Sequence, residues 1–326
     1  MKSDLNSLQS ILKGKEQQYQ LVIAIRGGEE YLISELNHKN LKVHWKNDRF
    51  YLIDLTAQPL LWVQWSSSDF EMVEVSSINA IIQKLKSYAL FWSNYTFDFH
   101  RRQALVLEAF THQGVVKRLN FPEDYAKFQQ QKNGGFWTLL EANLLLVAKK
   151  CSSWKYLGEM EFVENKVEPP SRAYLKLWEI FMYLPHWPLS HQSVMDLGAC
   201  PGGWTWVLKN FVREVVSVDK AVLVPQLMKD TKVKFVQESI FALDPKAWSH
   251  IDWLFCDVIC YPEKIVQLIQ KWLQAGHKGN FVFTIKFQGK TDFSAIDSLL
   301  AIQESKLIHL YHNKHELTWL YLQNQG

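Results

Sequence analysis

The second half of the chain alternates short apolar runs with amphipathic segments. The apolar runs predict buried strands, and the helical periodicity of residues 265–273 and 293–300 predicts helices between them. The apolar runs cover residues 193–197, 215–218, 233–236, 251–257, 280–287, 306–311 and 316–322. This alternation is typical of a doubly wound α/β sheet. A tight turn at Asn313-Lys314 predicts that the seventh strand runs back antiparallel.

The first half shows a different order of elements. A polar segment with leucines at helical spacing (residues 1–18) predicts a short helix or a loose arm. We then expect a strand, a helix, a hairpin around Asn47-Asp48 and another strand. These elements cover residues 19–25, 29–36, 43–45 with 49–55, and 60–66. The pattern predicts a small α/β domain over residues 1–74.

Residues 75–163 are predicted to form a second α+β unit. Ser77 caps an expected helix over residues 77–92, and the alternation in residues 104–110 predicts a strand. Residues 137–149 are compatible with a strand pair or with a buried helix. The polar, proline-rich residues 164–170 are a predicted linker, and residues 171–326 are the predicted C-terminal domain, which opens with a helix over residues 171–181.

Composition changes this picture little. The 326 residues include 48% hydrophobic and 21% charged positions, which is typical of a globular protein of two domains. The net charge of +3 does not indicate a basic domain, so nucleic-acid binding would depend on local patches. Three basic pairs are candidates, although each is most simply a solvated surface pair: Arg101-Arg102, Lys117-Arg118 and Lys149-Lys150.

Several features favour a cytoplasmic protein. No apolar run is long enough to predict a membrane span, and the N-terminus lacks the build of a signal peptide. Cysteines 151, 200, 256 and 260 have no C-x-x-C spacing, so we expect neither a zinc site nor a disulfide framework. We therefore expect no metal and no membrane partner, and a reducing compartment.

The stretch from Asp196 to Trp204, Asp-Leu-Gly-Ala-Cys-Pro-Gly-Gly-Trp, carries the most chemistry. It predicts a strand, a tight loop and a helix, where glycines at 198, 202 and 203 permit positive φ and close approach to a ligand. Asp196 lies where the strand meets the crevice, and Asp219 follows at a distance suited to ribose hydroxyls. The proline at 201 breaks the Gly-x-Gly-x-x-Gly pattern, which argues against NAD.

This stretch resembles the S-adenosylmethionine loop of the FtsJ-like RNA 2′-O-ribose methyltransferases, and the resemblance extends over residues 169–326. It implies a Rossmann-like methyltransferase fold, S-adenosyl-L-methionine as cofactor and RNA as substrate. The cofactor-binding residues that it implies are Asp196, Gly198, Cys200, Pro201, Gly202, Gly203, Trp204, Asp219, Glu238, Ser239 and Asp257. Two positions depart from the family pattern: Ser239 stands where relatives carry an acid for the adenine amino group, and Ala173 where they carry a serine.

The chain is most similar to the bacterial 23S rRNA cytidine 2′-O-methyltransferases. That similarity implies ribosomal RNA as the substrate and a reduced THUMP-like RNA-binding domain over residues 75–163. The THUMP assignment depends on position in the chain and on the strand-rich character of residues 137–161.

Four residues match the catalytic tetrad of the family in order: Lys176, Asp257, Lys286 and Glu316. By itself, Lys176 would be a snorkelling helix lysine and Asp257 a helix cap. A lysine that closes an apolar strand is costly unless it reaches the crevice, which favours a functional Lys286. We expect Lys286 to accept the hydroxyl proton, Asp257 and Lys176 to tune and position it, and Glu316 to orient the substrate or a lysine.

Four alternatives remain open. Amino-group methylation is disfavoured because Asp257-Val-Ile-Cys260 replaces the Asn/Asp-Pro-Pro-aromatic motif. Carbon methylation would use Cys256 or Cys260, which are more simply a buried and a loop thiol. The chain is alternatively a methyltransferase on another RNA, or a degenerate methyltransferase fold that serves as an RNA- or protein-binding module.

Overall fold

The computed structural model describes residues 2–14, 18–88, 91–110, 118–130, 134–153 and 155–323, with side chains from Leu5 onward. Part of the expected helix over 77–92 (residues 89–90) and Lys117 of one basic pair lie outside the described residues. The chain divides into two compact units, Met1–Phe162 and Val163–Gly326. Among the described residues, no helix combines the length and apolar character needed to cross a membrane.

The N-terminal unit is built on one seven-stranded sheet of order β2-β3-β1-β4-β7-β6-β5. All neighbouring strands pair antiparallel except β5 and β6, which are parallel. The strands are β1 (Tyr19–Ala24), β2 (Val43–Asn47), β3 (Phe50–Asp54), β4 (Val63–Glu74), β5 (Phe91–Asn94), β6 (Gly134–Glu141) and β7 (Leu144–Cys151). The helices are α1 (Lys2–Leu12), α2 (Glu29–His38), α3 (Ile78–Ser87), α4 (His100–Glu108), α5 (Tyr125–Gln130) and the 3₁₀ turn η3 (Tyr156–Gly158).

The expected hairpin is confirmed as β2–β3, and residues 137–149 form a strand pair, β6–β7. The strand predicted over residues 104–110 is wrong, because this segment belongs largely to helix α4. The buried residues of this region, Gln103, Val106 and Phe110, follow helical spacing. The sequence there also shows a short alternation of apolar and polar side chains, which led to the prediction of a strand.

Strand β4 connects the two predicted N-terminal segments. It ends at Glu74 and pairs with β1 on one side and with β7 on the other. Residues 1–74 and 75–163 therefore share one continuous sheet, and the THUMP-like nature of the second segment stays a prediction.

Two apolar cores cover the faces of this sheet, as the alternation of side chains along a strand requires. On β6, Phe136 and Leu140 belong to one core, and Trp137 and Leu139 to the other. Helix α1 contributes leucines to the first core, while α3 and α4 contribute to the second.

The C-terminal unit holds a second seven-stranded sheet of order β10-β9-β8-β11-β12-β14-β13. Its strands are β8 (Ser193–Leu197), β9 (Glu214–Asp219), β10 (Val233–Gln237), β11 (Trp253–Cys256), β12 (Asn280–Lys286), β13 (Ser305–Ile308) and β14 (Glu316–Tyr321). β8 to β12 pair parallel, and β14 runs antiparallel to β12 and β13. The predicted Rossmann-like sheet with an antiparallel seventh strand is confirmed.

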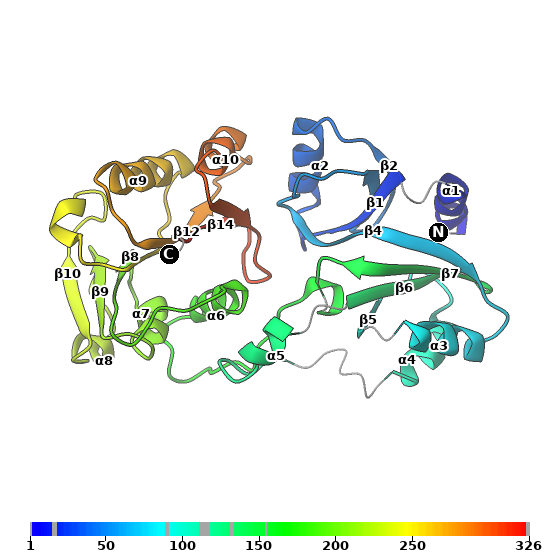
Figure 1. Ribbon diagram of the computed structural model, residues 1–326, viewed down its shortest axis with the longest axis horizontal. Coiled ribbons are helices and arrows are strands. Elements are labelled where there is room, and N and C mark those ends of the chain that lie inside the picture. The colour runs from blue at the N-terminus through cyan, green and yellow to red at the C-terminus, as the bar shows by residue number, and fades with distance from the viewer. Residues whose placement is uncertain are drawn as a thin grey trace. The chain divides into compact units, whose positions relative to one another are not determined.

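Helices lie on both faces of this sheet, with α9 and α10 on one side and α6 and α7 on the other (Figure 1). They are α6 (Tyr174–Tyr183), α7 (Gly203–Leu208), α8 (Pro225–Met228), α9 (Pro262–Gln274), α10 (Phe293–Leu300) and the 3₁₀ turn η4 (Pro245–Trp248). Strand order reverses at β8, which lies between β9 and β11. In such sheets the crevice for ligands opens at the carboxyl ends of the strands at this switch point.

Candidate active site

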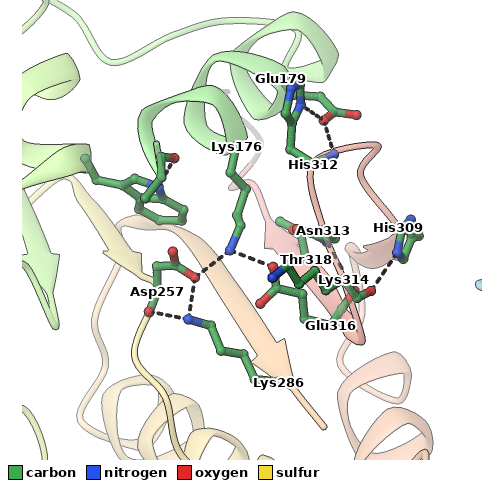
Figure 2. A network of polar contacts seen from close by, with 12 residues as sticks. Lys176, Glu179, Asp257, Lys286, His309, His312, Asn313, Lys314, Glu316 and Thr318 are labelled. Carbon is green, nitrogen blue, oxygen red and sulfur yellow. Dashed lines mark hydrogen bonds and ion pairs between the residues drawn. The ribbon is translucent and has the colours of Figure 1, made fainter. Parts of the chain in front are cut away.

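Four charged side chains meet at the carboxyl edge of the C-terminal sheet (Figure 2). Lys176 Nζ lies 2.9 Å from Asp257 Oδ1 and 2.7 Å from Glu316 Oε1. Lys286 Nζ lies 3.1 Å from the same Asp257 oxygen and donates to the main-chain oxygen of Asp257 at 2.8 Å. The four residues predicted to form a tetrad are therefore brought together in one chain of contacts.

The strand topology explains this meeting. Asp257 directly follows β11, Lys286 is the last residue of β12, and Glu316 is the first residue of β14. Because β14 runs antiparallel to β12, its start lies beside the end of β12, and Lys286 and Glu316 are register partners. Helix α6 then brings Lys176 to the three strand-end residues (Figure 2).

The two lysines differ in their electrostatic surroundings. Burial disfavours the charge of Lys176, whose side chain is 9% exposed, but attraction and hydrogen bonds from Asp257 and Glu316 outweigh this and raise its pKa. Lys176 is therefore held as a cation. Lys286 contacts one carboxylate oxygen and one carbonyl, and its side chain is more exposed, at 18%.

The glycine loop packs tightly on the chain itself. Gly198 and Gly202 adopt φ of +79° and +119°, which favour glycine. A Cβ at Gly202 would lie 2.2 Å from Leu227 Cδ1, and one at Gly203, whose φ is not in the left-handed region, would lie 2.5 Å from Ser171 Oγ. The glycines thus let the loop pack closely on neighbouring segments of the same unit. Their predicted close approach to a ligand stays a prediction.

Asp196 is 1% exposed at the end of β8. Its Oδ2 accepts a hydrogen bond from the Thr205 hydroxyl at 2.6 Å, and Thr205 in turn lies 2.8 Å from Ser217 Oγ. Burial raises the pKa of Asp196 to about 7, although the Thr205 hydrogen bond opposes the shift. A carboxyl group with such a pKa would gain most from a cationic ligand group.

Asp219 closes the loop from the neighbouring strand. Its Oδ2 accepts the Cys200 N–H at 2.9 Å, and its Oδ1 accepts the Ala221 N–H at 2.9 Å. Each carboxylate oxygen has two lone pairs, so Asp219 can still accept from ligand hydroxyls while it shapes the loop.

The family of FtsJ-like methyltransferases matches residues 169–309. Residues 169–309 form an FtsJ-like methyltransferase domain. Glu316, the last member of the charged cluster, lies just beyond the matched range.

The relatives of the chain include several proteins with the name "Ribosomal RNA large subunit methyltransferase M". The one from Aggregatibacter aphrophilus is 32% identical over 180 residues, which are 50% of this chain and 50% of that protein. The one from Chromohalobacter salexigens is 28% identical over 267 residues, 74% of this chain and 72% of that protein. The chain thus spans about half the length of the first relative. Among solved structures, a putative hemolysin from Streptococcus thermophilus gives a TM-score of 0.39 at 18% identity, covering 51% of this chain and 71% of that one.

Other predicted cofactor residues of the FtsJ-like domain are placed less directly. The Trp204 side chain is buried, and its indole N–H donates to the Ala173 carbonyl at 3.0 Å, which ties α7 to the entry of α6. Cys200, beside Pro201, directs its thiol to the Val222 carbonyl at 3.4 Å. Glu238 is exposed and Ser239 half-buried in the loop after β10. For these residues the role in cofactor binding stays a prediction.

The residues that support the site were missed in the sequence. Thr205 and Ser217 hold Asp196. Near Glu316, Asn313 donates to the Glu316 carbonyl, and Glu179 contacts His312 earlier in the same segment (Figure 2). One signal was available: Glu179 is an acid three residues after Lys176 on a strongly apolar helix, where a charge needs partners.

Two of the cysteines, Cys256 and Cys260, lie next to Asp257 and close to it in the chain. Burial raises the pKa of Cys256, and that of Cys260 to about 11, so neither thiol is predisposed to ionise at neutral pH. All four cysteines are free thiols. Within the described part of the chain, no group of three or more metal-binding side chains occurs.

Proposed function

We propose that this chain transfers a methyl group from S-adenosyl-L-methionine to a ribose 2′-hydroxyl of ribosomal RNA. The observation that carries the proposal is the Lys176–Asp257–Lys286–Glu316 cluster at the carboxyl edge of an FtsJ-like methyltransferase domain. The ribosomal substrate is supported by the names of the relatives, "Ribosomal RNA large subunit methyltransferase M". A ribosomal substrate also fits a cytoplasmic site of action.

The donor and acceptor groups at this edge fit the cofactor. Asp219, with lone pairs left on both oxygens, would accept the ribose hydroxyls. Asp196 and the loop 198–203 would hold the methionine end, where a cationic group would favour the ionised form of Asp196. Glu238 or Ser239 would contact the adenine. S-adenosyl-L-methionine supplies a methyl group that is already activated by its sulfonium, so the remaining chemical demand falls on the hydroxyl.

Lys286 would accept the proton of that hydroxyl. A lysine acts as a base when its amine is neutral, and Lys286 shares Asp257 Oδ1 with Lys176 at the edge where the hydroxyl would lie. Asp257 fixes the Lys286 amine through its side chain and its carbonyl. Glu316 would hold Lys176, and the cluster as a whole would position oxygen, methyl and sulfur in line.

Replacement of Lys286 tests the assignment. For Lys286→Ala we expect methyl transfer to fall about 100-fold or more, because general bases contribute on that scale, with cofactor affinity unchanged. Incorporation of labelled methyl into ribosomal RNA and an equilibrium titration with S-adenosyl-L-methionine measure the two quantities separately. Lys290→Ala, which removes an exposed lysine four residues later, is the matched control. Transfer at the wild-type rate by Lys286→Ala would exclude Lys286 as the base.

The substrate and the rival functions are separated by two further measurements. Mapping of ribose methylation in total RNA, with and without the protein, should reveal one site that depends on it, in ribosomal RNA. A dependent site in transfer or messenger RNA would correct the substrate. No cofactor binding at millimolar concentration would instead favour a methyltransferase fold that serves as a binding module.

A further inference from the structure

Glu179 is a buried acid that the proposed reaction does not use. It lies three residues after Lys176 on α6 and is 1% exposed. Its Oε1 accepts the Tyr311 N–H at 2.7 Å, and its Oε2 accepts both the His312 N–H at 3.0 Å and the His312 Nδ1 at 2.7 Å (Figure 2). A carboxylate only accepts hydrogen bonds, so His312 Nδ1 carries the proton in this contact.

We propose that Glu179 is a positioning residue, which holds residues 311–316 so that Glu316 meets Lys176. This proposal rests on the proposed function, because it concerns the same cluster. The hydrogen bonds of Glu179 go to the segment that leads into β14. Glu179 would therefore act on the cluster through this segment.

A second tether secures the same segment. Asn313 donates from Nδ2 to the Glu316 carbonyl at 3.2 Å and to Thr318 Oγ1 at 3.3 Å. Because a carbonyl cannot donate, only the amide nitrogen of Asn313 can make the bond to Glu316. Residues 311–316 are therefore fastened at their start by Glu179, in the middle by Asn313, and at their end by the contact of Glu316 with Lys176.

The strand register shows why this fastening matters. Glu316 is the first residue of β14 and faces Lys286 across the β12–β14 ladder. A slip by one residue would turn its side chain to the other face of the sheet and break the 2.7 Å contact with Lys176. Residues three apart on a helix share a face, so Lys176 and Glu179 project from the same side of α6. Helix α6 therefore contacts residues 311–316 at both ends of that segment.

The N-terminal unit provides a matched control. Glu35 on α2 is 0% exposed and accepts the N–H groups of Leu61, at 2.9 and 3.0 Å, and Trp62, at 3.1 Å. It also pairs with Lys39 at 3.0 Å. Glu35 and Glu179 are thus both buried helix acids that hold two consecutive main-chain amides and one basic side chain, but only Glu179 holds a segment of the charged cluster.

The test compares Glu179→Gln with Glu35→Gln in the full chain. In either variant an amide NH₂ replaces one carboxylate oxygen and faces backbone N–H donors. For Glu179→Gln we expect kcat for methyl transfer to fall about 100-fold, since displacements of about 1 Å cost this much, with the cofactor Kd and the KM for RNA unchanged. Hydrogen exchange of the amides of residues 311–316 should become about 10-fold faster in this variant. Glu35→Gln should accelerate exchange only at Leu61 and Trp62 and keep the wild-type kcat.

Two results would overturn the proposal. One is a kcat for Glu179→Gln within about twofold of wild type. The other is an equal loss of kcat in both variants, which would indicate a general loss of stability. If the wild-type chain methylates no RNA, the proposed function fails, and the exchange measurement alone decides the positioning role. Faster exchange at residues 313–316 in Glu179→Gln then supports it, and unchanged exchange there contradicts it.

Discussion

Each of the two units contains a largely buried strand with a lysine at or near its carboxyl end, and the two lysines have different surroundings. On β7, Lys149 lies 3.9 Å from Asp69 and 3.6 Å from Glu71, and its side chain is 32% exposed. On β12, Lys286 lies 3.1 Å from Asp257 Oδ1 and 2.8 Å from the Asp257 carbonyl, at 18% exposure. Loose, exposed pairs of the first kind contribute about 1 kcal/mol or less.

The difference lies in where each strand ends. β7 pairs antiparallel with β4, so the lysine of β7 lies beside surface residues of that neighbouring strand. β12 ends beside the carboxyl end of β11 and the start of β14, so charged residues from several strands meet at one edge. Partly buried charges that contact one another are weak evidence for stability, because desolvation offsets their attraction. The comparison therefore indicates that neither set of charges contributes much to stability, and a weak contribution at the C-terminal edge is compatible with the catalytic role proposed for it.

The first prediction extends this comparison to apolar packing in the N-terminal unit. Trp65 on β4 is 0% exposed and packs against Phe136 in the core that α1 covers. Trp65→Ala should lower the free energy of unfolding of the N-terminal unit by about 3–5 kcal/mol, through lost transfer energy and a cavity. Hydrogen exchange should accelerate in β1 and β4, while cofactor binding stays unchanged. Equal acceleration in β8 and β9 would show that the two units do not unfold separately.

The second prediction extends it to a buried acid of the C-terminal unit. Burial raises the pKa of Asp196 from its ordinary value of 3.8 to about 7. Between about pH 4 and pH 7, the Asp196 carboxyl is therefore protonated in the native state and ionised in the unfolded state. The stability of the C-terminal unit should fall as the pH rises through this window, by at most about 1.4 kcal/mol per pH unit, and should level off above it.

Asp196→Asn removes the titrating group and keeps a similar shape. Urea unfolding of wild type and variant, monitored by hydrogen exchange in β8 at several pH values, measures how the stability of the C-terminal unit depends on pH. The variant should lose the decline between pH 4 and pH 7. An identical pH dependence in both proteins would show that another group is responsible.

The sequence predicted the C-terminal unit better than the N-terminal unit. The parallel strands of the C-terminal unit are continuous apolar runs with polar residues at their ends, so their positions could be predicted from the chain alone. The four charged residues were predicted as a set through their resemblance to the tetrad of a known family. In the N-terminal unit both faces of β6 are buried and α4 carries mixed polarity, so periodicity could not separate strand from helix.

The contacts of the supporting residues could not be predicted from the sequence, for another reason. Glu179 and His312 are 133 positions apart, and nothing in their local pattern indicates that they meet. The same holds for Thr205 and Ser217, whose hydroxyls look like ordinary helix and strand residues until the sheet brings them to Asp196. Contacts of this kind depend on topology and not on local periodicity.

The smallest predicted effect compares one structural feature in both units. Ser77 accepts the Ala80 N–H at 3.1 Å at the start of α3, and Asp292 accepts the Ala295 N–H at 3.0 Å at the start of α10. Ser77→Ala and Asp292→Ala should each lower the free energy of unfolding of their own unit by about 1 kcal/mol. Neither should change kcat, because capping stabilises a helix wherever it lies. A loss of methyl transfer in Asp292→Ala alone would extend the functional edge of the C-terminal sheet to α10, which follows the strand that carries Lys286.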